Sequence, residues 1–348
     1  MKKQLSKRYL IPAGVCILIL LGLVYFYFFT SFTGKSDTLY VYVDQDDNYD
    51  SLIYKLRPIA KKHCLDAFSI LSHHSDLAHH TRTGRYAIKP SMGAYNVFRH
   101  FKNGMQEPLN VVVPSVRTME DMAGILGKKL MIDSATIVKA LTDESVCQKY
   151  GYDTTTIAAL FIPNTYDMYW DTSVNSLLDR MQKENKKFWD SEREQKATKL
   201  KLTPIQVTTL ASIVDEETAN NEEKPMIAGM YYNRLMLRDA KYPDGMPLQA
   251  DPTIKFAWKD FSLKRIYNKL LYIKSPYNTY INPGLPPGPI RVASVAGIDA
   301  VLNMVHHNYL YMCAKEDFSG THNFASTYQE HLANARRYAE ALNKRGIK

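Results

Sequence analysis

Three consecutive acidic residues, Asp215, Glu216 and Glu217, end an otherwise uncharged stretch that begins at Leu202. If this stretch is helical, only Glu217 shares a stripe with the apolar side chains, because Asp215 and Glu216 rotate away from it by roughly 120° or more. A carboxylic acid among apolar groups has a raised pKa, which keeps a general acid protonated near neutral pH. We therefore predict that Glu217 is a candidate general acid. The spacing alone fits an ion pair between Glu217 and an arginine equally well.

The stretch has the signals that start a helix. Thr203 suits the N-cap, Pro204 suits the first helical position, and Gln206 stands where a capping box requires Glu or Gln. At about 100° per residue the apolar stripe consists of Val207, Leu210, Ile213 and Val214. The sequence therefore predicts one helix over Leu202–Ala219 that carries the acid at its end.

Polar residues follow this helix at several points. A second helix is predicted from Asn221, with two acids in its first turn, and its Arg234 could orient a carboxylate or a substrate. Gln249 and Asp251 alternate onto one side of a segment that we expect to be extended, 247–253. The run 275–290 is rich in Pro and Gly, and such a long irregular loop inside a compact domain is more often functional than accidental.

Composition places the chain among ordinary globular proteins, with 348 residues, 45% hydrophobic and 23% charged residues. The net charge of +9 suits an anionic surface such as a membrane or cell wall, but no Lys/Arg block is dense enough to indicate nucleic acid. The four cysteines have no CxxC spacing, and the doublets His73-His74 and His79-His80 have no further ligands at a recognisable spacing. We expect no metal site and interpret the doublets as part of a polar loop.

The N-terminus carries a targeting signal. Four basic residues precede position 9, and residues 9–29 contain no charge, which is enough to span a membrane as a helix. We predict a cytoplasmic tail at residues 1–8, a single-pass anchor at residues 9–30, and the rest of the chain on the extracytoplasmic (periplasmic) side of the cytoplasmic membrane. A cleavable signal peptide is the alternative, but the apolar run is long and no A-x-A-like site follows it.

The remaining patterns mix strands and helices, which predicts an α+β fold. Strands are expected at 38–44, in RYAIKP (85–90), in LNVVVPS (109–115) and near His322. Helices are expected at 47–63, 94–102, 119–130, 134–141, 174–190 and 328–344. The aromatic stretch 160–170 suits stacking on a sugar or peptide, and it also suits a domain junction, which is the interpretation we favour.

Six motifs in order then carry a resemblance. ASIVDEETA, YYNRL, LQADPT, SPYNTY, GLPPGPI and HNF are similar to the pattern of the MltG (YceG-like) family of endolytic murein transglycosylases, from about Leu202 to the C-terminus. The resemblance implies a membrane-anchored enzyme without a cofactor that cuts peptidoglycan glycan strands internally. The bond cut would be the β-1,4 link from N-acetylmuramic acid (MurNAc) to N-acetylglucosamine (GlcNAc), leaving a 1,6-anhydroMurNAc end.

The family's catalytic glutamate precedes Thr in its motif and corresponds to Glu217. The family usually has Glu where this chain has Asp215, a departure that we expect to be tolerated because that side chain faces elsewhere. Asp251 is the candidate to position the N-acetyl group of the substrate. The other residues that could bind or support the substrate are Glu223, Asn233, Arg234, Gln249, Asn278, Tyr280 and His322.

The resemblance also implies the domain organisation. We expect a LysM-like small α+β region at 38–155 and a mixed α+β catalytic domain at 156–348, although Thr83-Gly84 stands where the family has Ala-Gly. It further implies cell-wall synthesis enzymes as partners. Two alternatives remain open: a lysozyme-like hydrolase of the same glycan, with Asp251 supporting attack by water, and a non-catalytic scaffold that binds the wall.

Overall fold

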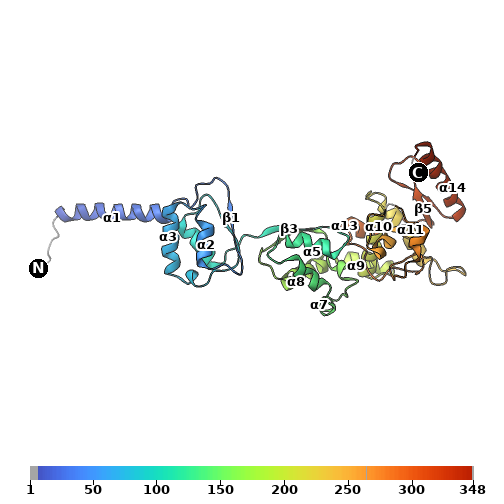
Figure 1. Ribbon diagram of the computed structural model, residues 1–348, viewed down its shortest axis with the longest axis horizontal. Coiled ribbons are helices and arrows are strands. Elements are labelled where there is room, and N and C mark those ends of the chain that lie inside the picture. The colour runs from blue at the N-terminus through green and yellow to red at the C-terminus, as the bar shows by residue number, and fades with distance from the viewer. Residues whose placement is uncertain (1–6, 264, 347–348) are drawn as a thin grey trace. The chain divides into compact units, whose positions relative to one another are not determined.

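The computed structural model describes residues 7–263 and 265–346, so most of the predicted tail at residues 1–8 lies outside the described residues. The chain divides into two compact units (Figure 1). The first contains Met1–Val111, Lys129–Ile132 and Asp167–Thr172, and the second contains Val112–Lys128, Asp133–Tyr166 and Ser173–Lys348. The aromatic stretch 160–170 therefore contains residues of both units, as expected for a junction.

The first unit begins with the apolar helix α1, Lys7–Phe28. Its segment Leu10–Phe28 has a mean hydropathy of 2.4 and is exposed, so in length and composition it fits the predicted membrane anchor. Strands β1 (Leu39–Val43) and β2 (Gly84–Ile88) then pair antiparallel, with Val41 opposite Tyr86. The helices of this unit are α1, α2 (Tyr49–Leu56), α3 (Lys62–His73), the short η1 (Asp76–Ala78) and α4 (Ala94–Asn103).

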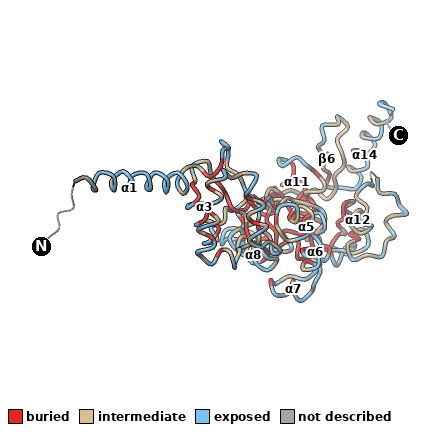
Figure 2. Tube along the Cα trace, turned by 60° about the vertical axis from the view of Figure 1, so that its left-hand side comes forward, coloured by how far each residue is buried: buried red, intermediate tan, exposed pale blue. Residues whose placement is uncertain are grey.

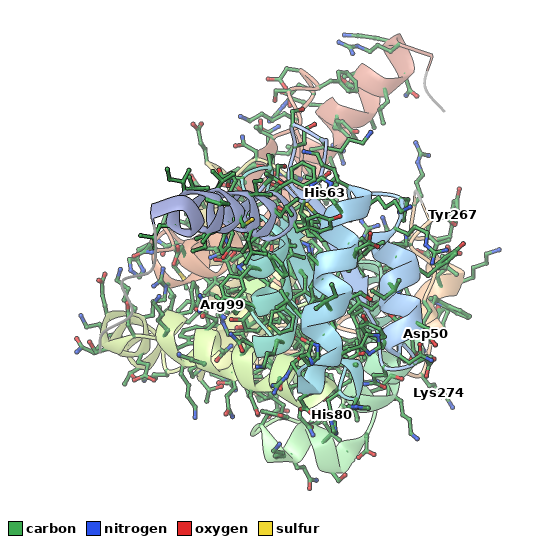
Figure 3. All side chains as sticks on the ribbon, turned by 90° about the vertical axis from the view of Figure 1, so that its left-hand side faces the viewer. Asp50, His63, His80, Arg99, Tyr267 and Lys274 are labelled. Carbon is green, nitrogen blue, oxygen red and sulfur yellow. The ribbon has the colours of Figure 1, made fainter. Side chains whose placement is uncertain are left out.

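One helix prediction in this unit is wrong. The expected helix 47–63 is two helices, because Pro58 has no N–H to continue the hydrogen-bond ladder after α2. Most of α3 was missed. The histidine doublets lie at and beyond its end, and Figure 3 labels the exposed His80. Its Nδ1 is 2.9 Å from Oδ1 of Asp76. The LysM-like character of region 38–155 stays a prediction.

The second unit contains most of the helices. Strands β3 (Leu109–Val113) and β4 (Asn164–Met168) form a two-stranded sheet that includes residues of both units, and β5 (Tyr311–Ala314) pairs antiparallel with β6 (His322–Ala325). The helices before the site are α5 (Met119–Gly127), α6 (Ser134–Leu141), α7 (Glu144–Lys149), η2 (Ile157–Leu160), α8 (Val174–Phe188) and α9 (Ser191–Lys199). The others are α10 (Pro204–Glu217), α11 (Lys224–Met236), α12 (Asp251–Trp258), η3 (Asn268–Tyr272), α13 (Val295–Leu302) and α14 (Tyr328–Lys344). This mixture of helix and strand confirms the α+β class.

Helix α10 lies in the core of this unit. It starts with the predicted capping box, in which Thr203 and Gln206 each accept a hydrogen bond from the other's backbone N–H. Helices α9, α11, α12 and α13 pack around it, so every residue from 207 to 214 is buried rather than one stripe alone. By contrast, most of α1 is exposed and drawn pale blue in Figure 2. Its buried hydroxyls bond to carbonyls of the same helix, as Thr208 does to Pro204 at 2.9 Å, which lets polar side chains enter the core.

Candidate active site

The first of the three acids, Asp215, connects three helices. Its side chain is only 3% exposed and forms an ion pair of 2.7 Å with Lys224 of α11. It also accepts hydrogen bonds from the backbone N–H (2.6 Å) and the hydroxyl (2.8 Å) of Ser294, the N-cap of α13. A buried carboxylate is tolerated when it is paired and hydrogen-bonded in this way. Asp215 therefore fixes the end of α10 against α11 and α13.

The second acid, Glu216, pairs with two arginines. Arg117 Nη2 and Arg291 Nη1 each donate to its carboxylate at 2.8 Å, and Arg291 also donates to the carbonyl of Ser115 at 3.0 Å. We expected Asp215 and Glu216 to face away from the core, and this is wrong. Both carboxylates are buried, because α10 is surrounded by elements that supply cations on those sides.

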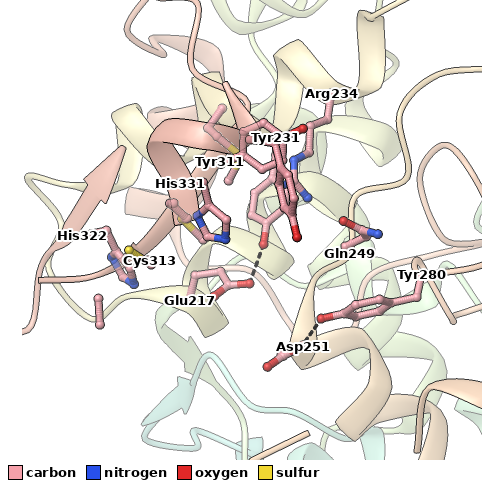
Figure 4. Close-up of a pocket in the computed structure, with 14 residues that line it drawn as sticks. Glu217, Tyr231, Arg234, Gln249, Asp251, Tyr280, Tyr311, Cys313, His322 and His331 are labelled. Atoms are coloured by element: carbon pink, nitrogen blue, oxygen red, sulfur yellow. Dashed lines mark hydrogen bonds between the residues drawn. The ribbon is translucent and has the colours of Figure 1, made fainter. Parts of the chain in front are cut away.

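Only the third acid, Glu217, faces a cavity. The cavity has a volume of about 320 Å³, and side chains from four helices, two strands and two connecting segments converge on it (Figure 4). Its lining residues are Glu217, Met230, Tyr231, Arg234, Gln249, Asp251, Tyr280, Tyr311, Met312, Cys313, Ala314, His322, Tyr328 and His331. The three ion pairs of Asp215 and Glu216 hold the helix end from which Glu217 points into this cavity.

The environment of Glu217 raises the pKa of its carboxyl to about 7. Burial is the largest cause, and the charge of Asp251 acts in the same direction. The hydroxyl of Tyr231 donates to Oε1 of Glu217 at 2.5 Å and opposes the rise, as do the charges of His322 and Arg234. Among the described residues no cation forms an ion pair with Glu217. The alternative that Glu217 pairs with an arginine is therefore wrong. Near pH 7 this carboxyl can give up a proton and take one back.

Arg234 lines the cavity and holds its walls together. Its Nε donates to the carbonyl of Leu310 at 2.5 Å and its Nη1 to that of Leu248 at 2.6 Å, while its guanidinium lies 5.3 Å from the ring centre of Tyr311. Burial lowers its pKa from the ordinary arginine value. Arg234 thus connects α11 to the segments that lead into Gln249 and into β5.

Gln249 and Asp251 both line the cavity, but the segment is not extended as we expected. Gln249 has a left-handed backbone (φ +50°) and Asp251 is the first residue of α12. The left-handed turn is held by a 3.0 Å bond from Gln249 N–H to the carbonyl of Thr279. The hydroxyl of Tyr280 donates to Asp251 Oδ1, and burial raises the pKa of Tyr280 far above its ordinary value. A turn followed by a helix N-terminus, rather than strand alternation, brings the two side chains together.

The other predicted residues divide into those that reach the cavity and those that support it. His322 lines it, and Glu223 holds His322 from behind through the backbone N–H (2.6 Å) and Nδ1 (3.1 Å). Glu223 lies just before α11 and not in its first turn as expected, because the helix begins at Lys224. Asn233 donates to the carbonyls of His307 and Tyr309, and Asn278 to those of Leu271 and Ile273. These two amides order loops and do not line the cavity.

Several lining residues were not predicted, chiefly Tyr231, Tyr311, Tyr328 and His331. Tyr231 lies on the predicted helix that carries Arg234, and a buried tyrosine needs a partner for its hydroxyl, which was a usable signal. Tyr328 and His331 lie in a helix whose pattern shows only an ordinary amphipathic helix. Among the described residues, no three His, Cys, Asp or Glu side chains gather closely enough to hold a metal ion.

Comparisons with known proteins identify relatives. The model of the YceG-like family matches residues 41–337. An endolytic murein transglycosylase of Bacillus subtilis is 33% identical over 175 residues, which are 50% of this chain and 46% of that protein. One of Streptococcus pneumoniae is 27% identical over 297 residues, 76% of this chain and 51% of that protein, so this chain spans about half the length of these curated relatives. The crystal structure of a YceG-like protein from Listeria monocytogenes superposes with a TM-score of 0.55 at 25% identity, covering 86% of this chain and 99% of that one.

Proposed function

This chain belongs to the YceG-like family, as its motifs indicated, and we propose that it is an endolytic lytic transglycosylase of peptidoglycan. The name of its relatives in Bacillus subtilis and Streptococcus pneumoniae supports the activity. The substrate is a glycan strand, and the cut leaves a 1,6-anhydroMurNAc end. No cofactor takes part in the reaction that we propose.

Glu217 carries the chemistry in two steps. Its protonated carboxyl donates to the oxygen of the MurNAc–GlcNAc bond while that bond breaks through an oxocarbenium-like transition state. The resulting carboxylate then takes the proton of the C6 hydroxyl, whose oxygen closes the anhydro ring at C1. The proton lost in the first step is regained in the second, and no water is consumed. Such acid–base help contributes on the order of 10²–10⁴-fold to the rate.

The observation that carries the proposal is the carboxyl of Glu217 on the wall of a cavity, where burial raises its pKa to about 7. A group with this pKa is present in both protonation states near neutral pH, and each step needs one of them. Tyr231 holds the carboxyl in place. Asp251, itself oriented by Tyr280, is the candidate to position the N-acetyl group of the substrate.

A lysozyme-like hydrolase is the second candidate, because a second carboxylate, Asp251, lines the same cavity as Glu217. Mass analysis of fragments from purified glycan strands decides between the two. Anhydro ends 18 Da lighter than reducing ends support the lyase, and reducing ends support the hydrolase. Glu217→Gln should abolish either activity. If the Glu217→Gln protein is correctly folded and still active, Glu217 is not the catalytic residue. A wall-binding role for the protein then becomes the better account.

We propose further that α1 crosses the membrane once, with its N-terminus in the cytoplasm. The basic residues before the apolar segment support this orientation. Protease added from the outer face should then digest the bulk of the chain, and protection of the bulk would contradict the orientation. Enzymes of wall synthesis are the proposed partners.

A further inference from the structure

The elements β5, β6 and α14, which we call the C-terminal module, supply half of the residues that line the cavity. These are Tyr311, Met312, Cys313, Ala314, His322, Tyr328 and His331. The acid–base steps above use none of them. The module therefore has a role at the site that the chemistry of Glu217 does not explain.

Among the residues that the C-terminal module contributes to the cavity, His331 is a polar group to which we have not yet assigned a role. Tyr328 and His331 are three residues apart in the first turn of α14, so they share one helix face. The ring of His331 stacks on Tyr311, with centres 5.4 Å apart and planes at 24°, and lies 6.1 Å from that of Tyr328. Figure 4 shows His331 on the same side of the cavity as His322 and Cys313, with Asp251 and Tyr280 on the other side.

Neither ring nitrogen of His331 has a hydrogen-bond partner among the described residues, and Nδ1 is buried. Burial and the charge of Arg234 lower the pKa of His331, so the ring is neutral at neutral pH. A buried N–H without an acceptor is rarer in proteins than an under-used acceptor. The favoured tautomer therefore leaves Nδ1 bare and places the proton on Nε2, the nitrogen that is not buried.

We propose that Nε2–H of His331 donates a hydrogen bond to an oxygen of the sugar ring bound next to Glu217, while Tyr311 and Tyr328 pack against the same sugar. Amphipathic rings beside a neutral donor match a pyranose, which has apolar C–H faces and a rim of hydroxyl and acetamide oxygens. His331 is thus a substrate contact, and it selects a sugar oxygen over an apolar group. This inference rests on the proposed function, because the glycan is the ligand.

The test compares His331→Phe, which keeps the stack on Tyr311 but has no donor, with His331→Gln, which restores a donor. Leu332→Ala is the matched control, because Leu332 is the next residue of α14, is 39% exposed and does not line the cavity. The full chain in detergent micelles is assayed for kcat/KM on purified peptide-free glycan strands. The Kd for the same strands is measured in a Glu217→Gln background, and the melting temperature of each variant checks the fold.

His331→Phe should lower kcat/KM and weaken glycan binding by roughly two- to tenfold, the usual effect of one lost hydrogen bond. His331→Gln should recover part of both, and Leu332→Ala should match the wild type. Equal affinity of His331→Phe and wild type, or equal losses in folded Phe and Gln variants, would overturn the proposal. If the Phe variant does not fold, tighter binding by His331→Gln than by His331→Ala supports it, and equal binding refutes it.

The two proposals fail in different ways. If the wild type releases no anhydro ends, the lyase function is wrong, but the affinities still decide the role of His331. If anhydro ends form and the Phe variant binds as the wild type does, the function stands and the role of His331 is wrong. Absence of glycan binding by the wild type would overturn both.

Discussion

Replacing Glu217 by glutamine should make the protein more stable at alkaline pH while removing its activity. The folded protein holds the pKa of Glu217 at about 7, against 4.5 ordinarily. A carboxyl whose pKa is raised by folding binds its proton more tightly in the folded state, so the wild type loses stability as pH rises from about 4.5 to 7. The whole difference corresponds to roughly 3 kcal/mol. Glutamine has no proton to lose, so the Glu217→Gln variant avoids this loss.

Thermal melting of the full chain in detergent measures the effect. At pH 8 the variant should melt higher than the wild type by roughly 6–12 °C, since 1 kcal/mol shifts a unit of this size by about 2–4 °C. At pH 4.5 the gain should disappear, because the wild-type carboxyl is then protonated in the folded state. Tyr231 can still donate to the amide oxygen of the glutamine, so the packing changes little.

Glu216→Gln is the matched control, the same chemical change one residue earlier on α10. It leaves Arg117 and Arg291 without their carboxylate, so the melting temperature should fall at pH 8. Equal melting temperatures of Glu217→Gln and wild type at pH 8 would refute the assigned pKa. A gain of the same size at pH 4.5 would show that packing, and not ionisation, is responsible.

Three further predictions concern the same helix end. Tyr231→Phe removes a bond to the charged form of Glu217, so the alkaline limb of the kcat/KM–pH profile should move up by about one pH unit; a fall would contradict this. Asp251→Asn removes a negative charge that raises the pKa of Glu217, so the alkaline limb should move down, and an unmoved limb would show that the two carboxyls are not coupled. Gly297→Ala should destabilise the protein by about 1–3 kcal/mol in urea unfolding, because the added Cβ would lie 2.5 Å from the carboxylate of Asp215. This clash should outweigh the helix preference of alanine. A gain in stability would mean that the carboxylate moves freely.

Local signals in the sequence were enough for the elements that carry the site. The capping box at Thr203 and the span of α14 both follow from side chains that are neighbours in the chain. The prediction failed where partners come from distant residues. Periodicity placed Asp215 and Glu216 away from the core, because it could not show that Lys224 and two arginines would meet them there.

The site was predicted in part for the same reason. Gln249 and Asp251 reach the cavity as expected, but through a left-handed turn. A glutamine at position 249 does not indicate such a turn. The amide of Asn278 proved to order a loop, since a motif marks a residue as important without saying for what. No neighbouring residue in the sequence pointed to His331. We singled it out because its ring nitrogens have no hydrogen-bond partner among the described residues, and only a three-dimensional structure can show this.

The position of the C-terminal module in the sequence also determines when the pocket is completed during synthesis. The ribosome makes Glu217 more than a hundred residues before it makes His331, and half of the wall that faces Glu217 comes from residues 311–331. A growing chain therefore has α1 and Glu217 long before it has the residues that complete the pocket. In our proposal, a growing chain that has not yet reached residue 311 has the acid but lacks half of the residues that line the glycan-binding cavity.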